Sequence, residues 1–290
     1  GMVCALNVCC RVFEDSNQAI TQVPIYPPFL TAPGHFGLTC SKLPMILENG
    51  RFTIDFAALN ELETSPNDLF MLCHPHNPVG TAYRQAELER LAQWILDREL
   101  VLCSDEIHCD LLLEPGLTHQ PMASFGKDIA DRTITLMAPS KTFNLPGFGC
   151  SFAIISNGEL RRKFKRAMAG IVPDPPAMSF SLTEAAFRHG EKWRIQLLDY
   201  LRGNREFALS KLNAMDGLIP YSPEATYLLW IDARELRIPC PQVFFEDHGV
   251  GLSDGRDFGA PGFLRMNLGC SRDLLQEALG RMSEAIRSLA

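Results

Sequence analysis

Three side chains with the chemistry to bind or transform a ligand, Asn77, Asp105 and Lys141, each follow an apolar run. The runs, each typical of a buried strand, are residues 69–73, 101–103 and 133–137. Open α/β sheets bind ligands at the carboxyl ends of their parallel strands. An amide, a carboxylate and an amine could therefore converge on one ligand at that edge. Taken alone, Lys141 lies on a turn of small and polar residues and would be a solvated surface charge.

Arg265 and Tyr26 are further candidates for contact with a ligand. Arg265 lies inside the apolar run 263–268, where a charge needs a partner. Either a nearby carboxylate pairs with it, or its guanidinium binds a substrate carboxylate through two parallel N–H donors. Tyr26 precedes two prolines that hold it rigidly, and its ring either packs against its neighbours or stacks on a flat ligand. The residues alone leave both pairs of alternatives open.

Composition excludes several classes of protein. A chain of 290 residues with 46% apolar residues can bury a substantial core in one large or two modest domains. Its net charge of −7 argues against nucleic acid as the main partner, because phosphate binding requires a basic excess. The basic stretch 159–169 is accordingly interpreted as a solvated helix face. No run approaches a membrane span, and residues 2–12 do not have the pattern of a signal peptide, so no membrane association is expected.

The ten cysteines favour a reduced, cytoplasmic protein. None belongs to a C-x-x-C pair, and several lie inside apolar runs, where free thiols behave as small hydrophobic groups. Cys103 and Cys109 flank His108, but this spacing does not match the usual zinc motifs. We therefore expect neither a disulfide framework nor a structural metal.

The first part of the chain alternates strands and helices. We expect helices at 2–13, 55–62, 84–98 and 159–169, and strands at 19–23, 69–73, 101–105, 133–137 and 151–155. Strand, helix and strand following one another with short links are the signature of parallel βαβ units. The strand at 151–155 is expected to pair in a hairpin-like manner with the one before it. The fold class is therefore α/β, with a mostly parallel sheet flanked by helices.

From about residue 170 the pattern changes. Prolines at 173–176 break the chain, and residues 181–213 are largely helical. Short strands at 226–231 and 263–268 follow, and Ser271 can cap a closing helix with one apolar stripe. We expect a large domain at 1–169, then at 170–290 a long connecting helix and a smaller C-terminal α+β domain.

Four ordered motifs resemble the fold-type I pyridoxal-phosphate (PLP) enzymes, the class I/II aminotransferase superfamily, with its three-layer fold. The motifs are Asn77-Pro78-x-Gly80, Asp105-x-x-His108, Ser140-Lys141 and Arg265. The wider stretches 75–78, 104–108, 131–136, 138–144, 223–230 and 255–259 are similar to the MalY/PatB branch. That branch contains cystathionine β-lyases and related carbon–sulfur lyases. The similarity extends from about Val3 to the end of the chain.

The resemblance implies a role for each polar residue around the cofactor ring. Lys141 would form a Schiff base with the cofactor and later carry the Cα proton. Asp105 would pair with the pyridine nitrogen and keep it protonated, so that the ring can accept electrons. Asn77 would hydrogen-bond the phenolic oxygen, and His108 stands where many relatives have a tyrosine that does the same.

The remaining roles concern stacking, phosphate and substrate. Tyr26 would stack on the ring, Ser140 would contact the phosphate, and Arg265 would bind the α-carboxylate of an amino-acid substrate. A homodimer with active sites at the interface is also implied. The expected activity is β-lysis to a thiol, pyruvate and ammonia, and transamination is the alternative that the motifs leave open.

The resemblance also concerns the start of the chain. Family members carry a substantial segment before this point, and residues 1–3 fall near the helix N-terminus that normally binds the cofactor phosphate. The resemblance therefore implies a chain shortened at its N-terminus. A non-catalytic homologue that acts through dimerisation or partner binding is an alternative of another class, although retention of Lys141, Asp105, Asn77 and Arg265 argues against it.

Overall fold

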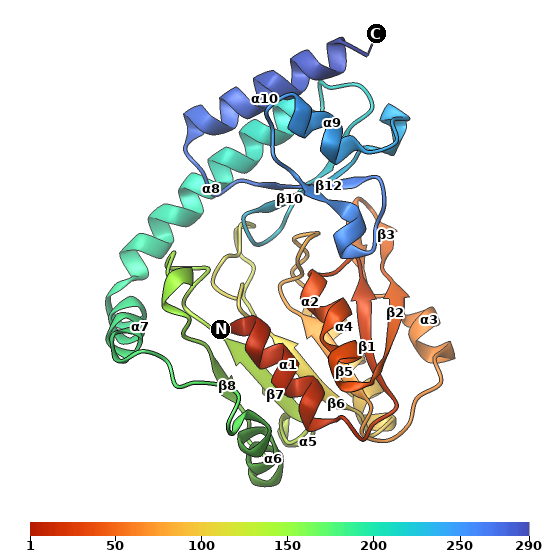
Figure 1. The fold of residues 1–290 in the computed structure, drawn as a ribbon, viewed down its shortest axis with the longest axis vertical. Helices are drawn as coiled ribbons and strands as arrows, with labels where there is room; N and C mark the ends of the chain where they lie inside the picture. The colour runs from red at the N-terminus through yellow and green to blue at the C-terminus, as the bar shows by residue number, and fades with distance from the viewer. Residues whose placement is uncertain (290) are drawn as a thin grey trace.

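The computed structural model describes residues 1–289, and its largest feature is a six-stranded sheet (Figure 1). In spatial order the strands are β2 (Thr39–Pro44), β1 (Gln18–Val23), β5 (Leu69–Cys73), β6 (Val101–Asp105), β7 (Thr133–Met137) and β8 (Phe152–Ile154). All neighbours are parallel except β7 and β8, which are antiparallel. The mostly parallel sheet and its hairpin-like last strand are thus confirmed.

Helices cover both faces of this sheet. One face carries α1 (Met2–Val12), α2 (Pro27–Thr31) and α6 (Gly158–Met168), and the other carries α3 (Phe56–Glu61), α4 (Gln85–Asp97) and α5 (Lys127–Ala130). Alternate residues of β5 pack into two separate cores, Leu69 and Met71 with the first set of helices and Phe70 and Leu72 with the second. Because successive side chains of a strand point to opposite faces, this division produces the expected three layers.

Smaller elements complete this part of the chain. They are the hairpin β3 (Ile46–Glu48) and β4 (Arg51–Thr53), and the 3-10 turns η1 (Pro33–Phe36), η2 (Met122–Ser124) and η3 (Pro146–Phe148). Asp55 caps α3, because its Oδ1 accepts hydrogen bonds from the backbone N–H groups of Ala57 and Ala58 at 3.0 Å. Up to residue 169, the predicted helix and strand positions agree with the structure to within one or two residues.

A second, four-stranded antiparallel sheet lies in the last third of the chain. Its order is β11 (Ser253–Asp254), β12 (Phe263–Asn267), β10 (Leu228–Asp232) and β9 (Ile219–Tyr221). The accompanying helices and turns are α9 (Pro241–Asp247), α10 (Arg272–Arg287), η4 (Arg234–Leu236) and η5 (Gly255–Phe258). Leu229 and Leu264 pack against Leu279 in a core of their own, as expected for a smaller α+β unit. The boundary after residue 169 stays a prediction.

The expected helix at 181–213 is in fact two helices, α7 (Ala177–His189) and α8 (Glu191–Leu212). They meet at Gly190, where a Cβ atom would lie 2.4 Å from the Ala186 carbonyl oxygen and 2.4 Å from the Phe143 ring. Only glycine fits there. From this junction α8 runs to the second sheet (Figure 1). The strand expected at 226–231 begins later, at Leu228, because Thr226 adopts a left-handed φ of 70°.

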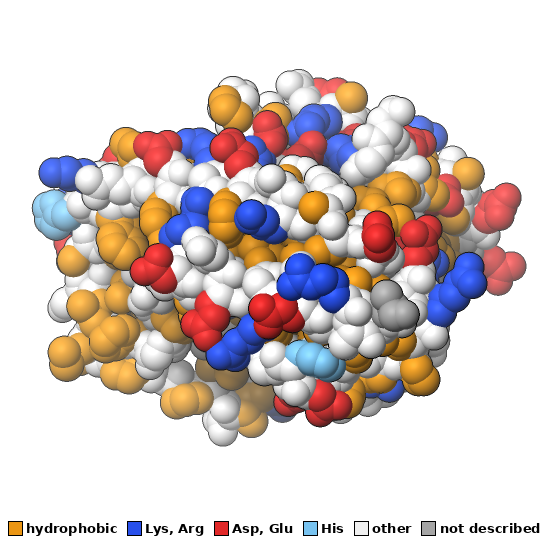
Figure 2. All heavy atoms as spheres, turned by 90° about the horizontal axis from the view of Figure 1, so that it is seen from above, with side chains coloured by type: hydrophobic (Ala, Val, Ile, Leu, Met, Phe, Trp, Pro, Cys, Tyr) orange, Lys and Arg blue, Asp and Glu red, His pale blue; other side chains and the backbone are white. Residues whose placement is uncertain are grey.

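Acidic and basic side chains are interspersed on the face that carries α10, and they form no large patch of one charge there (Figure 2). Across residues 1–289 no helix is both long enough and apolar enough to cross a membrane. The candidate ligand-binding residues follow β5, β6 and β7, at the carboxyl edge of the large sheet.

Candidate active site

The register of the parallel strands brings the three predicted side chains to one edge. Cys73 of β5 lies beside Asp105 of β6, and Asp105 lies beside Leu136 of β7. The turns that follow β5 and β7 carry Asn77 and Lys141 and therefore open on the same side as Asp105. Lys141 is close enough to Asp105 that the two charges affect each other's pKa. The predicted convergence is present in the structure.

Asp105 is buried with little to balance its charge. Its side chain is 3% exposed, and within residues 1–289 its only hydrogen bond is from the Ile107 N–H to Oδ1, at 3.1 Å. The pKa of Asp105 is raised to about 7, mainly by burial and in addition by the Glu106 charge, although the Ile107 N–H and Lys141 oppose the shift. A cationic partner at the open side of this carboxylate would stabilise its ionised form.

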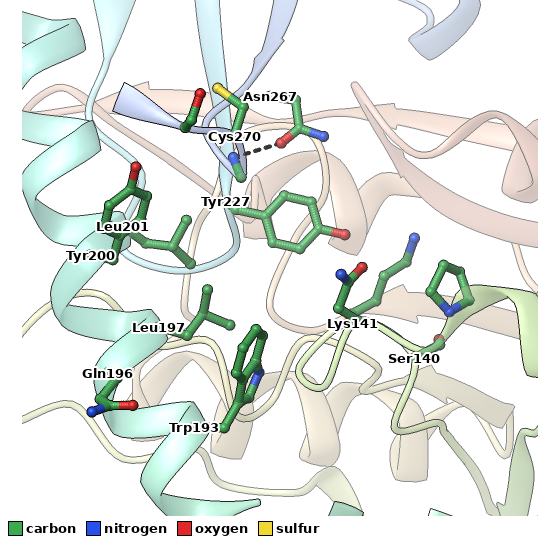
Figure 3. Close-up of a pocket in the computed structure, with 14 residues that line it drawn as sticks. Ser140, Lys141, Trp193, Gln196, Leu197, Tyr200, Leu201, Tyr227, Asn267 and Cys270 are labelled. Atoms are coloured by element: carbon green, nitrogen blue, oxygen red, sulfur yellow. Dashed lines mark hydrogen bonds between the residues drawn. The ribbon is translucent and has the colours of Figure 1, made fainter. Parts of the chain in front are cut away.

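Lys141 lies on a tight turn, as predicted. The turn is closed by backbone hydrogen bonds from Phe143 to Pro139 at 2.9 Å and from Leu145 to Ser140 at 3.1 Å. Burial lowers the pKa of Lys141, and the nearby Arg265 charge lowers it further. The side chain borders a pocket of about 610 Å³ whose other wall is formed by α8 (Figure 3). Lys141 is therefore a half-buried amine and not a solvated surface charge.

Arg265 on β12 faces Asn77 across the boundary between the two sheets. Its Nη1 donates to Asn77 Oδ1 at 3.0 Å and its Nη2 to Ser253 Oγ at 3.2 Å. The guanidinium carbon lies 4.7 Å from the centre of the Phe258 ring. Arg265 forms no salt bridge with any residue that the structure describes, so the hypothesis of a buried ion pair is wrong. Burial lowers its pKa, and a carboxylate ligand would reverse that effect.

Gly80 holds the Asn77 loop against the second sheet. Its φ is +72°, and a Cβ atom there would lie 2.4 Å from Pro223 Cβ. The Gly80 carbonyl accepts hydrogen bonds from the backbone N–H groups of Glu224 and Ala225, both at 2.9 Å. The loop that carries Asn77 is thus packed on the segment that leads into β10.

His108 and Tyr26 lie beside the same cluster. His108 Nδ1 is buried and has no hydrogen-bond partner in residues 1–289. Burial, followed by the charges of Lys141 and Arg265, lowers the pKa of His108 to about 3, so the ring is neutral at pH 7. Tyr26 precedes α2, and burial and the nearby Asp105 raise its pKa. Whether Tyr26 stacks on a ligand stays a prediction.

The predicted phosphate contacts lie on the same side of the sheet. Ser140 lines the 610 Å³ pocket together with Lys141. Helix α1 begins at Met2, and the Gly1 amine donates to the carbonyl of Gly149, in the segment after Lys141, at 3.1 Å. The roles of Ser140 and of the α1 N-terminus in anion binding stay predictions.

The sequence interpretation missed Tyr227 and Ser253. Tyr227 lines the pocket, lies near enough to Arg265 to affect its pKa, and has its ring centre 6.3 Å from that of His108. Its position at the start of an apolar strand was the available signal. Ser253 reaches Arg265 only because β11 pairs with β12 in a register that the sequence does not reveal.

The unbalanced groups fit the cofactor that the motifs imply. A protonated ring nitrogen would supply the missing partner of Asp105, and a polar ring substituent would meet the unpaired Nδ1 of His108. Asn77 Oδ1 is occupied by Arg265, so its amide N–H groups remain to donate. The amine of Lys141 can bond to an aldehyde. This edge therefore offers the cofactor two hydrogen-bonding side chains, a carboxyl group and an amine, which are the groups it requires.

Comparison with known proteins finds similar chains and similar structures. The model for "Aminotransferase class I and II" matches residues 1–282. The chain is 33% identical to "Cystathionine beta-lyase PatB" of Bacillus subtilis (strain 168), over 99% of this chain and 76% of that protein. A crystal structure of OvoB is 45% identical with a TM-score of 0.97, covering 99% of this chain and 76% of that one. Cystalysin from Treponema denticola, whose structure contains pyridoxal 5′-phosphate, is 30% identical with a TM-score of 0.92, covering 100% of this chain and 76% of that one.

These matches extend over nearly the whole described chain, and they agree with the three-layer fold. The chain spans about three quarters of the length of these relatives. The chain belongs to the class I and II aminotransferase family.

Proposed function

We propose that the protein is a pyridoxal-phosphate-dependent carbon–sulfur β-lyase. It would cleave a sulfur amino acid and one water to a thiol, pyruvate and ammonia. The observation that carries the proposal is the similarity to cystathionine β-lyase PatB over almost the entire chain. The convergence of Lys141, Asp105 and Arg265 at one edge supports it, because these are the groups that cofactor and amino-acid substrate would need.

The chain's own residues would divide the work of holding the cofactor. Lys141 would bond to it, Asp105 would hold its ring nitrogen, and Asn77 and His108 would donate to its ring oxygen. Tyr26 would cover the ring and Ser140 would contact the phosphate. When bound, the cofactor supplies an electron-accepting ring that stabilises a carbanion at Cα.

Substrate binding and proton transfer would rest on two further groups. Arg265 is desolvated, and its Nη1 and Nη2 each donate one hydrogen bond within residues 1–289, so further N–H groups remain for a bidentate contact with an α-carboxylate. Because burial and Arg265 both lower the pKa of Lys141, its amine is neutral more often than a solvated lysine would be. The neutral amine can accept the Cα proton once the substrate is in place. The thiolate then leaves from Cβ.

Transamination is the second candidate, favoured by the family to which the chain belongs. Both reactions begin with removal of the Cα proton by the same lysine. They differ in where the next proton goes and in whether a group leaves from Cβ. A transaminase needs a keto-acid partner to complete its cycle, whereas a β-lyase does not.

The test uses that difference. Purified protein is mixed with pyridoxal phosphate, and the visible absorption band of the lysine-bound cofactor is recorded for the parent chain and for Lys141→Ala. We expect the band in the parent only. Cystathionine is then supplied without a keto acid, and pyruvate release supports the lyase. Amino transfer that depends on an added keto acid would show that the protein is an aminotransferase instead. Absence of the band would favour the hypothesis of a non-catalytic homologue.

The proposal includes a homodimer. Large apolar side chains are exposed on one face around α7 and β8, which we name the α7 face: Phe148, Phe152, Ile154, Ile171, Met178, Phe180 and Phe187. Met178 is 68% exposed and Phe180 58%. The ring centres of Phe152 on β8 and Phe187 on α7 lie 6.1 Å apart. Exposed apolar surface of this kind is typical of a protein interface. In Figure 2 hydrophobic side chains also gather toward the side on which α7 lies in Figure 1.

We expect Phe180→Asp to convert a dimer of the parent to a monomer, as measured by light scattering after gel filtration. Leu274→Asp is the matched control, because Leu274 is also exposed, at 56%, but lies on α10. A parent that elutes as a monomer would contradict the dimer.

A cytoplasmic location also belongs to the proposal. All ten cysteines are free, and several are buried in the sheet cores. Free thiols in this number suit a reducing compartment.

A further inference from the structure

A buried chain of hydrogen bonds lies behind the Asn77 loop. His76 Nε2 is 2.8 Å from the Pro24 carbonyl oxygen, and His76 Nδ1 is 2.9 Å from the Tyr83 hydroxyl. The same hydroxyl is 2.9 Å from Oε1 of the Gln22 side-chain amide. His76, Tyr83 and Gln22 are 0%, 5% and 3% exposed. These groups have no role in the mechanism above, and water does not compete for their hydrogen bonds.

The chemistry of the partners fixes the direction of each hydrogen bond. A carbonyl oxygen only accepts, so His76 Nε2 must carry a proton and donate to Pro24. Burial lowers the pKa of His76 to about 4, so Nδ1 is an unprotonated acceptor at pH 7. Tyr83 therefore donates its single proton to Nδ1. In the structure Gln22 Oε1 faces the Tyr83 oxygen. Because the tyrosine has no second proton to give, the oxygen and nitrogen of this amide must be exchanged, so that its NH₂ group donates to the Tyr83 oxygen.

The chain of bonds joins the two loops that flank the expected cofactor ring. His76 directly precedes Asn77, and Pro24 lies two residues before Tyr26. Backbone hydrogen bonds from His76 N–H to the Thr81 carbonyl and from Gly80 N–H to the His76 carbonyl, both 2.8 Å, close the loop around Asn77. The position of His76 is therefore transmitted to Asn77 on one side and, through Pro24, to Tyr26 on the other.

We propose that His76 and Tyr83 are positioning residues that fix the Asn77 amide and the Tyr26 ring at a set separation around the cofactor. The proposal rests on the proposed function for the identity of that cofactor. Joining two loops by one imidazole makes their positions interdependent, so that loosening the imidazole loosens both. Loss of the Tyr83 hydroxyl leaves His76 Nδ1 buried without a donor, which is costly in a water-free interior.

Tyr83 also packs in the core between the sheet and α4, so its ring must be kept in the test. Tyr83→Phe removes only the hydroxyl. Tyr221→Phe is the matched control, because the Tyr221 hydroxyl makes no hydrogen bond within residues 1–289 and its ring packs on Phe52 of the β3–β4 hairpin. Circular dichroism and thermal unfolding are used to check that both variants fold.

The first measurement needs no cofactor. Amide hydrogen exchange is followed by mass spectrometry in the cofactor-free parent and in both variants. We expect faster exchange in Tyr83→Phe in both segments, 24–29 and 76–81, and no change in Tyr221→Phe. A change confined to one segment, or none in either, would overturn the inference that His76 and Tyr83 join the two loops.

The second measurement concerns the cofactor. We expect the dissociation constant for pyridoxal phosphate to rise about tenfold in Tyr83→Phe, which corresponds to about 1.4 kcal/mol. The midpoint pH of the visible band should rise, because a displaced Asn77 stabilises negative charge on the ring oxygen less well. An unchanged midpoint with a lower melting temperature would mean that Tyr83 only packs. If the parent chain shows no band, the proposed function fails, and hydrogen exchange alone then decides whether the loops are joined.

Discussion

Two groups of charged and polar side chains lie where the two sheets meet, and they differ in how fully they are paired. The ionic joint consists of Arg51, Arg84, Glu87 and Glu224. The catalytic cluster consists of Asn77, Asp105, His108, Lys141 and Arg265. In the joint, Arg51 bonds both carboxylates, Glu87 at 2.8 Å and Glu224 at 3.1 Å, and Arg84 also bonds Glu224. In the cluster, no salt bridge joins any two members among the residues described.

The pKa shifts run in opposite directions in the two groups. In the joint, although burial alone would act the other way, hydrogen bonds and opposite charges raise the pKa of Arg51 and lower that of Glu87. In the cluster, burial raises the pKa of Asp105 and lowers that of Lys141, so each shift disfavours the charged form. A group whose charges satisfy one another stabilises the fold, whereas a group whose charges are unsatisfied is prepared for a ligand.

Neutralising Asp105 should have the largest effect on activity, without any loss of stability. Asp105→Asn removes the partner of the ring nitrogen, so we expect kcat for pyruvate release to fall on the order of 10³-fold. The melting temperature of the cofactor-free protein should stay the same or rise. Asp216→Asn, at an exposed aspartate, is the control and should leave kcat unchanged. An Asp105→Asn protein that is inactive because it unfolds would contradict the view that Asp105 serves activity and not stability.

The pH dependence of the unfolding free energy should reveal the contribution of the Asp105 carboxyl. The folded pKa of Asp105, about 7, lies above its unfolded value, so the folded state binds the extra proton and the parent loses stability as pH rises from about 4 to 7. Asp105→Asn lacks this loss. We expect the unfolding free energy of the cofactor-free variant to exceed that of the parent by an amount that grows with pH, up to about 4 kcal/mol.

Urea unfolding of both proteins at a series of pH values measures this difference. Titration of His108, whose pKa is about 3 in the folded state, is common to both proteins and cancels in the difference. A difference that stayed constant between pH 4 and 7 would show that Asp105 is not perturbed by burial.

Breaking the ionic joint should lower the stability of the fold and leave activity nearly unchanged. Glu224→Gln keeps the shape of the side chain but leaves Arg51 and Arg84 with less compensation. We expect the unfolding free energy to fall by about 2 kcal/mol and kcat to change less than about threefold. Thermal unfolding and pyruvate release measure the two effects. A large loss of kcat without loss of stability would show that the ionic joint acts in catalysis and not in stabilising the fold.

The smallest effect is expected at the rim of the cluster. Ser140→Ala removes one hydroxyl from the pocket beside Lys141. Because one hydrogen bond contributes about 1 kcal/mol, the dissociation constant for the cofactor should rise about fivefold. Spectroscopic titration with pyridoxal phosphate measures it, and Ser156→Ala, at an exposed serine after β8, should not change it. Equal affinities for the two variants would remove Ser140 from the phosphate contacts.

Much of the fold was predictable because β5 and β7 are short apolar runs bounded by polar residues. The parallel order then follows from the alternation of strands with helices, and it places Asn77, Asp105 and Lys141 together. The specific identity of the site came from the motif resemblance, since the residues around Lys141, taken alone, indicate a solvated surface charge.

What the sequence could not provide depends on contacts between distant segments. The division of the long helix at Gly190 follows from close packing against Phe143, which no local pattern encodes. The partner of Arg265 proved to be Asn77, from the other sheet and 188 residues away, instead of a carboxylate. Ser253 joined them only through strand register. The late start of β10 reflects the left-handed backbone of Thr226, which is unusual for a β-branched residue.

The contact between Gly80 and the segment before β10 limits how the molecule can move. Gly80 bonds the backbone of Glu224 and Ala225, and Asn77 bonds Arg265, so the Asn77 loop is attached to the second sheet at two points. A rotation of that sheet relative to the larger one would displace Asn77 from Asp105 and Lys141. Any opening that admits substrate without distorting the site would therefore have to bend the chain at a place other than this contact.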